Sequence, residues 1–377
     1  MSIHNSVIYL DNNSTTQICS EAKDALNFIS EKYFANPSSQ SGVGLQANEM
    51  LENARKGIRK LLNASTYNLY FTSGATEANN IVIKTHLEVA LNAHLTVLTS
   101  KLEHSSVLNL FKFYETKGLN VIYLNNNQVY RLDNLPDLSN IYFASLMTYN
   151  NESGIFTDIN KLRVLLGEET IIHSDLTQMV GKVQTDIKEI HSDFFTFSGH
   201  KFHSPKGIGA ILSNKRHKLN PLFIGGGQEG AIRPGTSNLA AAYSMYIALD
   251  VATKFLVSND VLHVRDEFEN LILDNISGVN IFGKDMIRLP NTSYLSIKGV
   301  NSDVLVTNLK NVAIGNGSAC NSYSHEISHV AREMTDSIEE ASSVIRVSFS
   351  RYNTMEEVKD AVNAILKEVL YIREMKV

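Results

Sequence analysis

The segment NLYFTSGATEANNIVIKTHLEVA, residues 68–90, decides the fold class of this chain. Its first four residues are mostly apolar or aromatic, which is typical of a short strand, and residues 76–90 have the spacing of a helix. Small residues form the turn between the two. A strand that runs through a tight turn into a helix is the building unit of α/β proteins.

The same alternation continues on both sides of this segment. Helical spacing recurs at residues 49–62, 106–114 and 159–166, and short strands are expected at 95–98, 121–124, 141–145, 170–173, 194–197 and 209–212. This pattern predicts an α/β sheet with helices on both faces.

The C-terminal third of the sequence has a different order of elements. A long helix is expected at 237–256, followed by helices at 261–273, 302–308 and 355–373 and strands at 292–297 and 344–348. This order is typical of an α+β unit. We therefore expect a large α/β domain over residues 14–255, and a smaller α+β domain formed by residues 1–13 and 256–377.

The bulk composition places the chain among ordinary globular proteins. It has 377 residues, of which 43% are hydrophobic and 19% charged, and a net charge of -5. That charge gives no electrostatic reason to bind nucleic acid or an anionic membrane. No apolar stretch approaches the ~20 residues that cross a bilayer, and no basic, apolar leader opens the chain. We expect a soluble cytoplasmic protein.

The two cysteines, Cys19 and Cys320, are far apart in the sequence. A reducing compartment argues against a disulfide between them. An isolated cysteine is commonly a small buried hydrophobic residue, but the neighbours of Cys320 are mostly small and polar, as in an exposed loop. Cys320 is therefore a candidate reactive thiol. His325 and His329 have metal-ligand spacing if they lie on a helix, but no matching ligands accompany them, and no metal site is expected.

Three segments together form a candidate ligand-binding and catalytic site, and the first of them lies at residues 72–77. Residues 72–77, Thr-Ser-Gly-Ala-Thr-Glu, open a helix with small residues, and their N–H groups with the Thr76 hydroxyl can bind an anion. Taken alone, this segment is equally an N-capped helix after a tight turn. It is not a P-loop, since no Gly-Lys-Ser/Thr follows, and it lacks the Gly-x-Gly-x-x-Gly of dinucleotide-binding folds.

Asp175 and Lys201 complete the set. Asp175 comes just after a buried strand, where open α/β sheets bind ligands, and Lys201 follows the next strand along the chain. Singly, Asp175 could be a helix N-cap and Lys201 a surface charge. An anion cradle, an acid and a lysine in this order are what a pyridoxal-phosphate site needs: phosphate donors, a carboxylate for the pyridinium nitrogen and an amine for the aldehyde.

The chain resembles the NifS/IscS group of cysteine desulfurases, in the class V aminotransferase family, nearly end to end. Each matching motif is weak alone, but the set occurs in family order at compatible spacing. The motifs lie at residues 8–16, 36–39, 72–77, 103–104, 150–152, 174–178, 198–201, 225–229, 233–236, 317–320 and 346–348. The resemblance implies the fold type I architecture of pyridoxal-phosphate enzymes, with a mainly parallel seven-stranded sheet in the large domain.

The resemblance also implies a role for each residue at the coenzyme. Lys201 is implied to form the Schiff base with pyridoxal 5'-phosphate and to move protons as general base and acid. Asp175 is implied to keep the pyridine nitrogen protonated, and Gln178 to lie near the phenolic oxygen. His104 is implied to stack on the ring and help deprotonate the substrate. The remaining coenzyme contacts are implied for Ala75, Thr76, Asn151, Ser198, His200 and Thr236.

At the substrate, Arg346 is implied to hold the carboxylate of L-cysteine, with Asn151 and Asn36 in the same substrate site. The Cys320 thiolate is implied to attack the substrate sulfur, which gives L-alanine and a persulfide on Cys320. The persulfide sulfur would pass to an acceptor protein for Fe–S cluster assembly, tRNA thiolation or DNA phosphorothioation. Thr236 is implied to reach the phosphate of a neighbouring subunit, which means a homodimer.

The sequence departs from the family pattern at three places that spare the lysine, the acid and the thiol: residues 11–14, 40–42 and 325–328. These departures concern the identity of the sulfur acceptor, and they are compatible with a family member that serves DNA phosphorothioation or another specialised thiolation pathway. Two alternatives stay open. Another class V reaction, such as transamination or selenocysteine lysis, would not need the Gly-Ser-Ala-Cys segment. A non-catalytic sulfur-relay subunit would not need Lys201, Asp175, His104 and Cys320 together.

Overall fold

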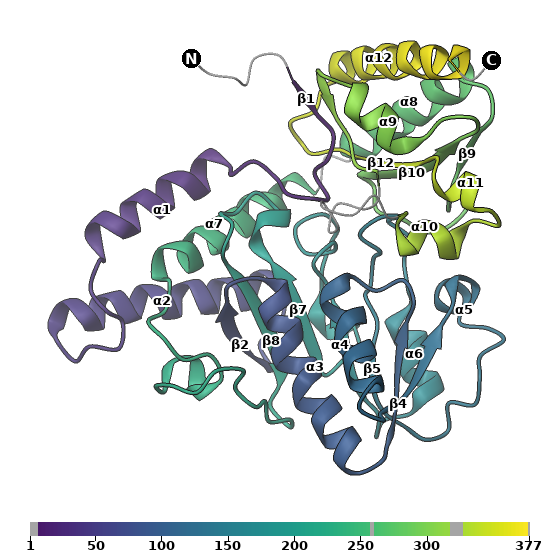
Figure 1. Ribbon diagram of the computed structural model, residues 1–377. Helices are drawn as coiled ribbons and strands as arrows, with labels where there is room; N and C mark the ends of the chain where they lie inside the picture. The colour runs from purple at the N-terminus through teal and green to yellow at the C-terminus, as the bar shows by residue number, and fades with distance from the viewer. Residues whose placement is uncertain (1–6, 257–259, 317–326, 376–377) are drawn as a thin grey trace. The chain divides into compact units, whose positions relative to one another are not determined.

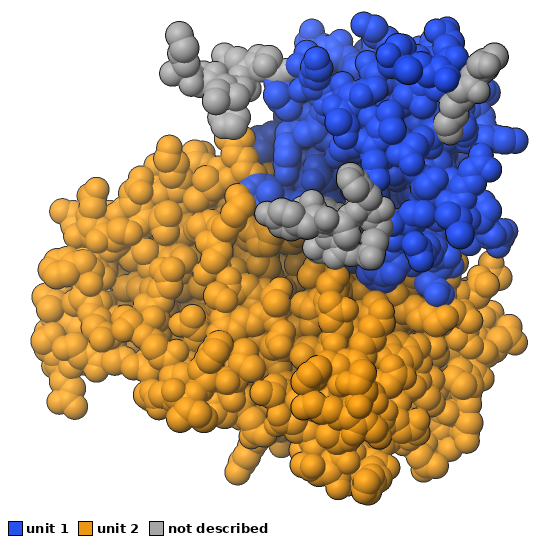
Figure 2. Space-filling model, in the orientation of Figure 1, with its two compact units in different colours: residues 1–16, 149–156, 258–377 blue, residues 17–148, 157–257 orange. Residues whose placement is uncertain are grey.

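The computed structural model describes residues 7–256, 260–316 and 327–375. The chain divides into two compact units: unit 1 with residues 1–16, 149–156 and 258–377, and unit 2 with residues 17–148 and 157–257 (Figure 2). Segment 149–156, predicted within the larger domain, belongs to unit 1. Its contacts explain why: Ile155 forms a bridge with Arg288, and Glu152 accepts a hydrogen bond from Tyr294, both residues of unit 1.

Unit 2 is built on a seven-stranded sheet with the order β2-β8-β7-β6-β5-β3-β4 (Figure 1). β8 runs antiparallel to both of its neighbours, and the other neighbouring strands run parallel. The strands are β2 (Tyr67–Thr72), β3 (Thr96–Ser100), β4 (Asn120–Leu124), β5 (Ile141–Ser145), β6 (Ile171–Asp175), β7 (Phe194–Ser198) and β8 (Gly209–Asn214). The predicted α/β class with a mainly parallel sheet is confirmed.

The helices of unit 2 pack on this sheet and on one another. α3 packs against the strands from β5 to β8, and α1 and α2 both pack against α7. The helices are α1 (Ser20–Lys32), α2 (Gly42–Leu61), α3 (Ala75–Asn92), α4 (Ser105–Glu115), α5 (Asn126–Arg131), α6 (Ile159–Leu166) and α7 (Leu239–Phe255), with short 3-10 turns η1 (Ile187–Glu189), η2 (Gly199–Lys201) and η3 (Gln228–Ala231).

The sequence explains why the centre of the sheet is stable. Every residue of β7, Phe-Phe-Thr-Phe-Ser, is buried, as expected of an inner strand in a mainly parallel sheet that is covered on both faces. One apolar cluster joins Phe194 of β7 with Ile81 of α3, and a second joins Phe143 of β5 with Phe111 of α4. Burial of each such side chain contributes roughly 1.5–3 kcal/mol. Helix α3 is thereby fixed against the strands that carry the chemistry.

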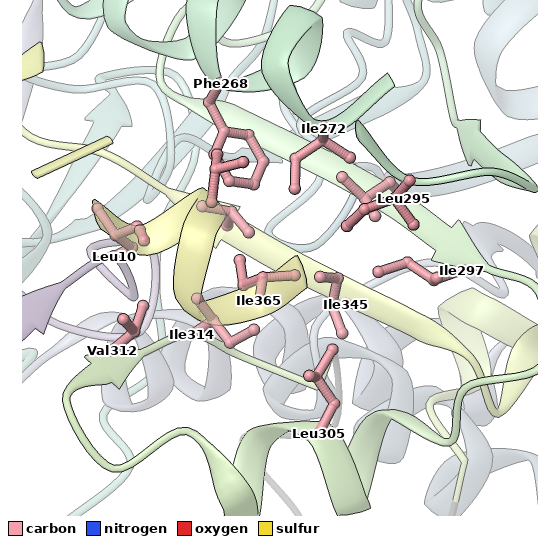
Figure 3. Close-up of a cluster of buried hydrophobic side chains, with 14 of the residues drawn as sticks. Leu10, Phe268, Ile272, Leu295, Ile297, Leu305, Val312, Ile314, Ile345 and Ile365 are labelled. Carbon is pink, nitrogen blue, oxygen red and sulfur yellow. The ribbon is translucent and has the colours of Figure 1, made fainter. Parts of the chain in front are cut away.

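Unit 1 has an antiparallel sheet of order β12-β10-β9 and a parallel pair, β1 with β11. Its larger apolar cluster brings together Phe268, Leu295, Ile345 and Ile365 (Figure 3), and a smaller one forms around Phe282 and Tyr294. The elements are β1 (Ile8–Tyr9), α8 (Asp260–Asn275), β9 (Val279–Ile281), β10 (Thr292–Ile297), α9 (Ser302–Asn308), β11 (Val312–Ala313), α10 (His329–Met334), α11 (Ile338–Ala341), β12 (Val344–Ser348) and α12 (Met355–Glu374).

The topology brings the chemical segments of unit 2 to one edge of its sheet. β2, β3, β6 and β7 all run in the same direction, so their carboxyl ends meet at that edge. These ends are Thr72, Ser100, Asp175 and Ser198. Within the described residues, no single helix has the length and apolar character to cross a membrane; α7 and α8 meet that test only when taken together as a broken pair.

Candidate active site

Asp175 is the last residue of β6, and its carboxylate is buried. Oδ2 accepts a hydrogen bond from Asn79 Nδ2 at 2.9 Å, and Oδ1 accepts one from the backbone N–H of Thr177 at 2.8 Å. Both donors are neutral, and the part of the chain that the structure describes supplies no ion pair to this carboxylate. The negative charge is thus held in place but not compensated, which suits a cationic group of a ligand.

His104 is connected to this acid through two side chains. His104 caps α4: its Nδ1 accepts the backbone N–H of Ser106 at 3.1 Å and lies 2.8 Å from Ser106 Oγ. Asn79 Nδ2, which contacts Asp175, also lies 2.9 Å from Ser106 Oγ. The structure therefore brings His104 and Asp175, both predicted site residues, into one hydrogen-bonded network.

Behind Asn79, this network runs into the sheet. Thr196 Oγ1 donates to Asn79 Oδ1 at 2.5 Å and lies 3.0 Å from His173 Nε2, and His173 Nδ1 lies 2.8 Å from Ser145 Oγ. Burial lowers the pKa of His173 to about 4, against the opposing effect of the nearby Asp175 charge. His173 is therefore neutral at physiological pH and fills a structural position.

Lys201 ends the short turn η2 that follows β7, and it is partly exposed. Burial, with the positive charges of Lys201, Lys206 and Lys182, lowers the pKa of the neighbouring His200 to about 4. Lys182 Nζ donates a short hydrogen bond to the buried Gln178. This side of the sheet edge therefore has several ammonium groups and a neutral imidazole, a composition that suits a phosphate and an aldehyde.

The turn before α3 lies against the start of β8. A Cβ at Gly209 would lie 2.7 Å from the Gly74 backbone and from the Phe197 carbonyl oxygen, so only glycine allows this close approach. A Cβ at Gly74 would lie 3.6 Å from Ser198 Oγ. Ser198 thus adjoins the N-terminus of α3, where Ala75 and the exposed Thr76 are the first residues. The helix start that was predicted to bind an anion therefore lies beside Ser198, a residue that the resemblance assigned to the phosphate.

Arg346 lies in unit 1, on β12, and is 2% exposed. Its Nη1 donates to the Asn151 carbonyl oxygen at 2.8 Å and its Nη2 pairs with Asp11 Oδ1 at 2.7 Å. Arg346 Nε and Asn151 Oδ1 are buried and have no hydrogen-bond partner among the described residues. Such atoms are rare in folded proteins and indicate a missing ligand or water. The predicted pair Arg346 and Asn151 is therefore brought together.

A buried carboxylate adjoins this pair. Glu152 Oε2 accepts hydrogen bonds from Ser328 Oγ at 2.6 Å and from Tyr294 at 3.0 Å. Burial raises the pKa of Glu152 to about 7, although these bonds and the Arg346 charge oppose the shift. Glu152 thereby joins β10, the strand that pairs with the Arg346 strand β12, to the segment that begins at Ser328.

Of the remaining predicted residues, the structure describes Asn36 and Thr236. Asn36 is exposed, and its Oδ1 accepts the N–H of Ser38 at 2.9 Å. Thr236 is exposed on the segment before α7. Cys320 lies outside the described residues, as does His325. Within the described part of the chain, no group of three or more His, Cys, Asp or Glu side chains could hold a metal ion.

Three residues of the site were missed as functional positions by sequence reasoning. Asn79 and Ser106 lie inside helical segments, where a polar residue is ordinarily on the surface, and only the packing of α3 on the sheet buries Asn79. Glu103 was noted only as part of a motif. It is 1% exposed, and burial raises its pKa to about 8. A polar residue among the apolar positions of α3 was the one available signal for Asn79.

The residues present fit pyridoxal phosphate. The uncompensated buried carboxylate of Asp175 matches a protonated pyridine ring, the α3 N-terminus with Ser198 matches a phosphate, and Lys201 supplies an amine at the same sheet edge. The unpartnered Nε of Arg346 matches a carboxylate.

Comparison with known proteins agrees with this assignment. The family model for class V aminotransferases matches residues 8–361. The cysteine desulfurase IscS of Rickettsia prowazekii is 34% identical over 379 residues, covering 98% of this chain and 92% of the relative. A solved NifS-like protein superposes with a TM-score of 0.87 at 27% identity, over 97% of this chain and all of the other. SspA, solved in complex with cysteine, gives 0.79 at 28% identity, over 92% and 100% of the two chains.

Members of this family depend on pyridoxal phosphate. The match spans both units, so it covers the Asp175 network as well as the Arg346 pair. The chain therefore belongs to the class V aminotransferase family, in the IscS/NifS group of cysteine desulfurases.

Proposed function

We propose that this protein is a pyridoxal-phosphate-dependent desulfurase of free L-cysteine, with Cys320 as the sulfur-accepting thiol. In the overall reaction, L-cysteine and the Cys320 thiol give L-alanine and a Cys320 persulfide. The sulfur atom leaves the substrate β-carbon and bonds to the Cys320 sulfur, so no external oxidant or reductant is needed. When bound, the coenzyme supplies the electron sink that makes the carbon–sulfur bond of L-cysteine breakable.

The observation that carries the proposal is the buried Asp175 carboxylate, held by two neutral donors at the same sheet edge as Lys201. Asp175 would hold a proton on the coenzyme ring, because a buried anion without a cationic partner favours a cation beside it. Lys201 would bind the coenzyme aldehyde and then carry the substrate α-proton. Ala75, Thr76, Ser198 and His200 would hold the phosphate, and Gln178 the phenolic oxygen.

Arg346 and Asn151 would orient the substrate. The Arg346 guanidinium is fixed by Asp11 and by the Asn151 carbonyl, so its unpartnered Nε is preorganised for a carboxylate oxygen. Asn151 Oδ1 is an acceptor with no partner and suits an N–H or O–H of the bound molecules. Asn36 would contribute to binding of the same substrate.

We further propose that two copies of the chain form a homodimer in which Thr236 of each reaches the coenzyme phosphate of the other. The exposed position of Thr236 is compatible with a contact to a second chain. The Cys320 persulfide would pass its sulfur to an acceptor protein, for Fe–S assembly or for the thiolation of tRNA or DNA.

The central experiment measures both products. The purified protein is incubated with L-cysteine and a reductant, and sulfide and alanine are quantified. We expect equal amounts of the two from the wild type. Lys201→Ala should lose the coenzyme absorbance and both products, because Lys201 is the amine proposed to bind the coenzyme aldehyde and to carry the substrate α-proton. Cys320→Ala should keep the yellow colour but release little sulfide.

The matched control is Cys19→Ala, which removes the only other thiol. Cys19 is 1% exposed, so its thiol is closed to a substrate, and its backbone N–H at the N-cap of α1 donates to the His203 carbonyl oxygen at 3.0 Å, a bond that alanine keeps. This variant should release sulfide as the wild type does. Full-rate desulfuration by Cys320→Ala would refute the assignment of the thiol, and alanine formation without any sulfur release would favour another class V reaction.

A further inference from the structure

The amide of Asn79 is oriented by its three partners. Nδ2 lies 2.9 Å from Asp175 Oδ2 and 2.9 Å from Ser106 Oγ, and Oδ1 lies 2.5 Å from Thr196 Oγ1. A carboxylate only accepts hydrogen bonds, so the NH2 group must face Asp175 and the carbonyl oxygen must face Thr196. Both amide hydrogens are then used, one for Asp175 and one for Ser106.

The residues behind Asn79 can hydrogen bond in only one direction. Thr196 has one hydroxyl hydrogen and gives it to Asn79 Oδ1, so its oxygen must accept from His173 Nε2–H. The proton of neutral His173 is therefore on Nε2, and His173 Nδ1 accepts from the Ser145 hydroxyl. Every bond in this part of the network agrees with the orientation of the Asn79 amide.

The same reasoning fixes the protonation of His104. Ser106 Oγ accepts from Asn79, and its own hydrogen is available to His104 Nδ1 at 2.8 Å. The backbone N–H of Ser106 also points at Nδ1, at 3.1 Å, and a backbone N–H can only donate. Nδ1 must therefore be the nitrogen without a hydrogen. The N-terminus of α4 further disfavours a second proton on this ring, because the helix dipole is positive there.

We propose that Asn79 is a positioning residue that couples Asp175 to His104, and that neutral His104 carries its proton on Nε2 and therefore acts as a donor. The inference rests on the proposed function, since it assumes that His104 meets the coenzyme or the substrate. In this state Nε2 has no lone pair, so His104 gives a hydrogen bond or a proton and does not remove one. The substrate protons are then left to Lys201.

The first test reads the tautomer directly. Protein with 15N-labelled histidine is studied by two-bond 1H–15N correlation NMR, in the apo form and with the coenzyme, and His104→Gln identifies the His104 signals. We expect Nε2 to be the protonated nitrogen and Nδ1 the bare one in both forms. A proton on Nδ1, or rapid exchange between the two tautomers, would overturn the proposal.

The second test separates a donor from a base. Glutamine can place an NH2 group close to the position of the imidazole Nε2, whereas alanine cannot. His104→Gln should keep a kcat about 10-fold above that of His104→Ala, because a hydrogen bond to a charged group is worth roughly that factor. Equal losses in the two variants would mean that the ring accepts a proton, and would contradict the donor role.

The coupling is tested at Asn79. Asn79→Leu is nearly isosteric but removes both donors, and it should weaken coenzyme binding to the apo protein by about 10-fold, since Asp175 loses one of its two hydrogen bonds. Its effect on kcat should not add to that of His104→Gln in a double-mutant cycle. Asn80→Ala is the control, because the one side-chain hydrogen bond of Asn80 among the described residues is to the Thr76 carbonyl on the same helix. Additive effects would refute the coupling.

These outcomes are distinguishable from a failure of the proposed function. A wild type that makes no alanine or sulfide from L-cysteine would refute the desulfurase activity, while the NMR tautomer and the coenzyme affinities would still test the network. A wild type that desulfurates cysteine with His104 protonated on Nδ1 would refute the inference alone.

Discussion

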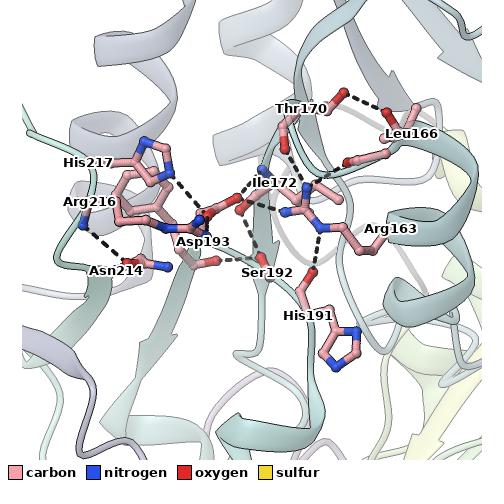
Figure 4. Close-up of polar contacts among 12 residues, drawn as sticks. Arg163, Leu166, Thr170, Ile172, His191, Ser192, Asp193, Asn214, Arg216 and His217 are labelled. Carbon is pink, nitrogen blue, oxygen red and sulfur yellow. Dashed lines mark hydrogen bonds and ion pairs between the residues drawn. The ribbon is translucent and has the colours of Figure 1, made fainter.

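Asp175 and Asp193 are both buried in unit 2, at opposite ends of the neighbouring parallel strands β6 and β7. Asp193, just before β7, is paired with two arginines: Arg163 Nη2 lies 2.7 Å from Oδ2 and Arg216 Nη2 lies 3.6 Å from Oδ1, and His217 Nε2 also lies 3.1 Å from Oδ1 (Figure 4). Asp175, at the end of β6, accepts hydrogen bonds from an amide and a backbone N–H, and no cation pairs with it in the described ranges 7–256, 260–316 and 327–375.

This difference separates a structural acid from a functional one. The Asp193 charge is neutralised within the protein, and the same carboxylate also accepts the N–H of Ile172, which fixes β6 beside β7. The Asp175 charge is left for a ligand to neutralise. Both carboxylates are buried to a similar degree, so burial alone would not have told them apart; the charge of the partners does.

The largest effect is expected from Asp175→Asn. The substitution keeps the shape of the side chain but removes the charge that would hold a proton on the coenzyme ring. We expect kcat for alanine formation to fall by about 10²–10⁴-fold, the range for loss of a group that controls a proton. Thermal unfolding should hardly change. An activity close to that of the wild type would mean that the two aspartates do not differ in function.

Asp193→Asn should lower stability and leave coenzyme binding intact. Removing one partner of the buried pair leaves Arg163 uncompensated, so we expect the free energy of unfolding to fall by about 3–5 kcal/mol, measured by urea denaturation. Coenzyme absorbance should be retained in the folded protein. Arg216→Ala is the control: that arginine is 70% exposed and should contribute less than about 1 kcal/mol. Loss of the coenzyme without loss of stability would contradict the structural role of Asp193.

Glu103 is a third buried acid in unit 2, and its protonation state should make the stability of the protein depend on pH. Burial, with a smaller contribution from Asp175, raises its pKa to about 8, so Glu103 is mostly protonated at neutral pH and leaves Asp175 as the charged acid. Because its folded pKa lies above its unfolded value, the native state binds more protons than the unfolded state between pH 4.5 and 8. Stability should therefore fall as pH rises, by about 2 kcal/mol between pH 6 and 8.

Glu103→Gln should remove that part of the slope. The free energy of unfolding of both proteins is measured by urea denaturation at pH 6, 7 and 8. Any advantage of the wild type over the variant in this free energy should shrink or reverse toward pH 8. A difference that does not depend on pH would mean that Glu103 is ionised throughout this range.

The long elements of the fold could be read from the sequence because their patterns are local. β5, β10, β12, α6 and α9 begin and end at the predicted residues. Helix α1 was missed because only Ala22 and Ile29 are buried, too few to form an apolar stripe. The two-residue strands β1 and β11 pair across some three hundred positions, and no local pattern encodes such a contact.

The residues of the candidate site also fall into two groups, those that the sequence predicted and those that only the tertiary structure identifies. Asp175, Lys201 and His104 were predicted because strand ends and family motifs mark them. The resemblance also gave Arg346 and Asn151, and the structure adds that each keeps one unpartnered buried atom. Asn79 and Ser106 were not predicted, because their importance arises only when α3 packs on β6 and α4 packs on α3. Tertiary contacts, not spacing, turn these two polar helix residues into a link between an acid and a histidine.

The most direct measurement is the protonation state of the coenzyme itself. Apo protein reconstituted with pyridoxal phosphate labelled with 15N in the ring can be examined by NMR near pH 7.5, alongside Asp175→Asn. We expect a protonated ring nitrogen in the wild type and an unprotonated one in the variant, because only the wild type offers a carboxylate without a cationic partner. An unprotonated ring in the wild type would contradict the role given to Asp175.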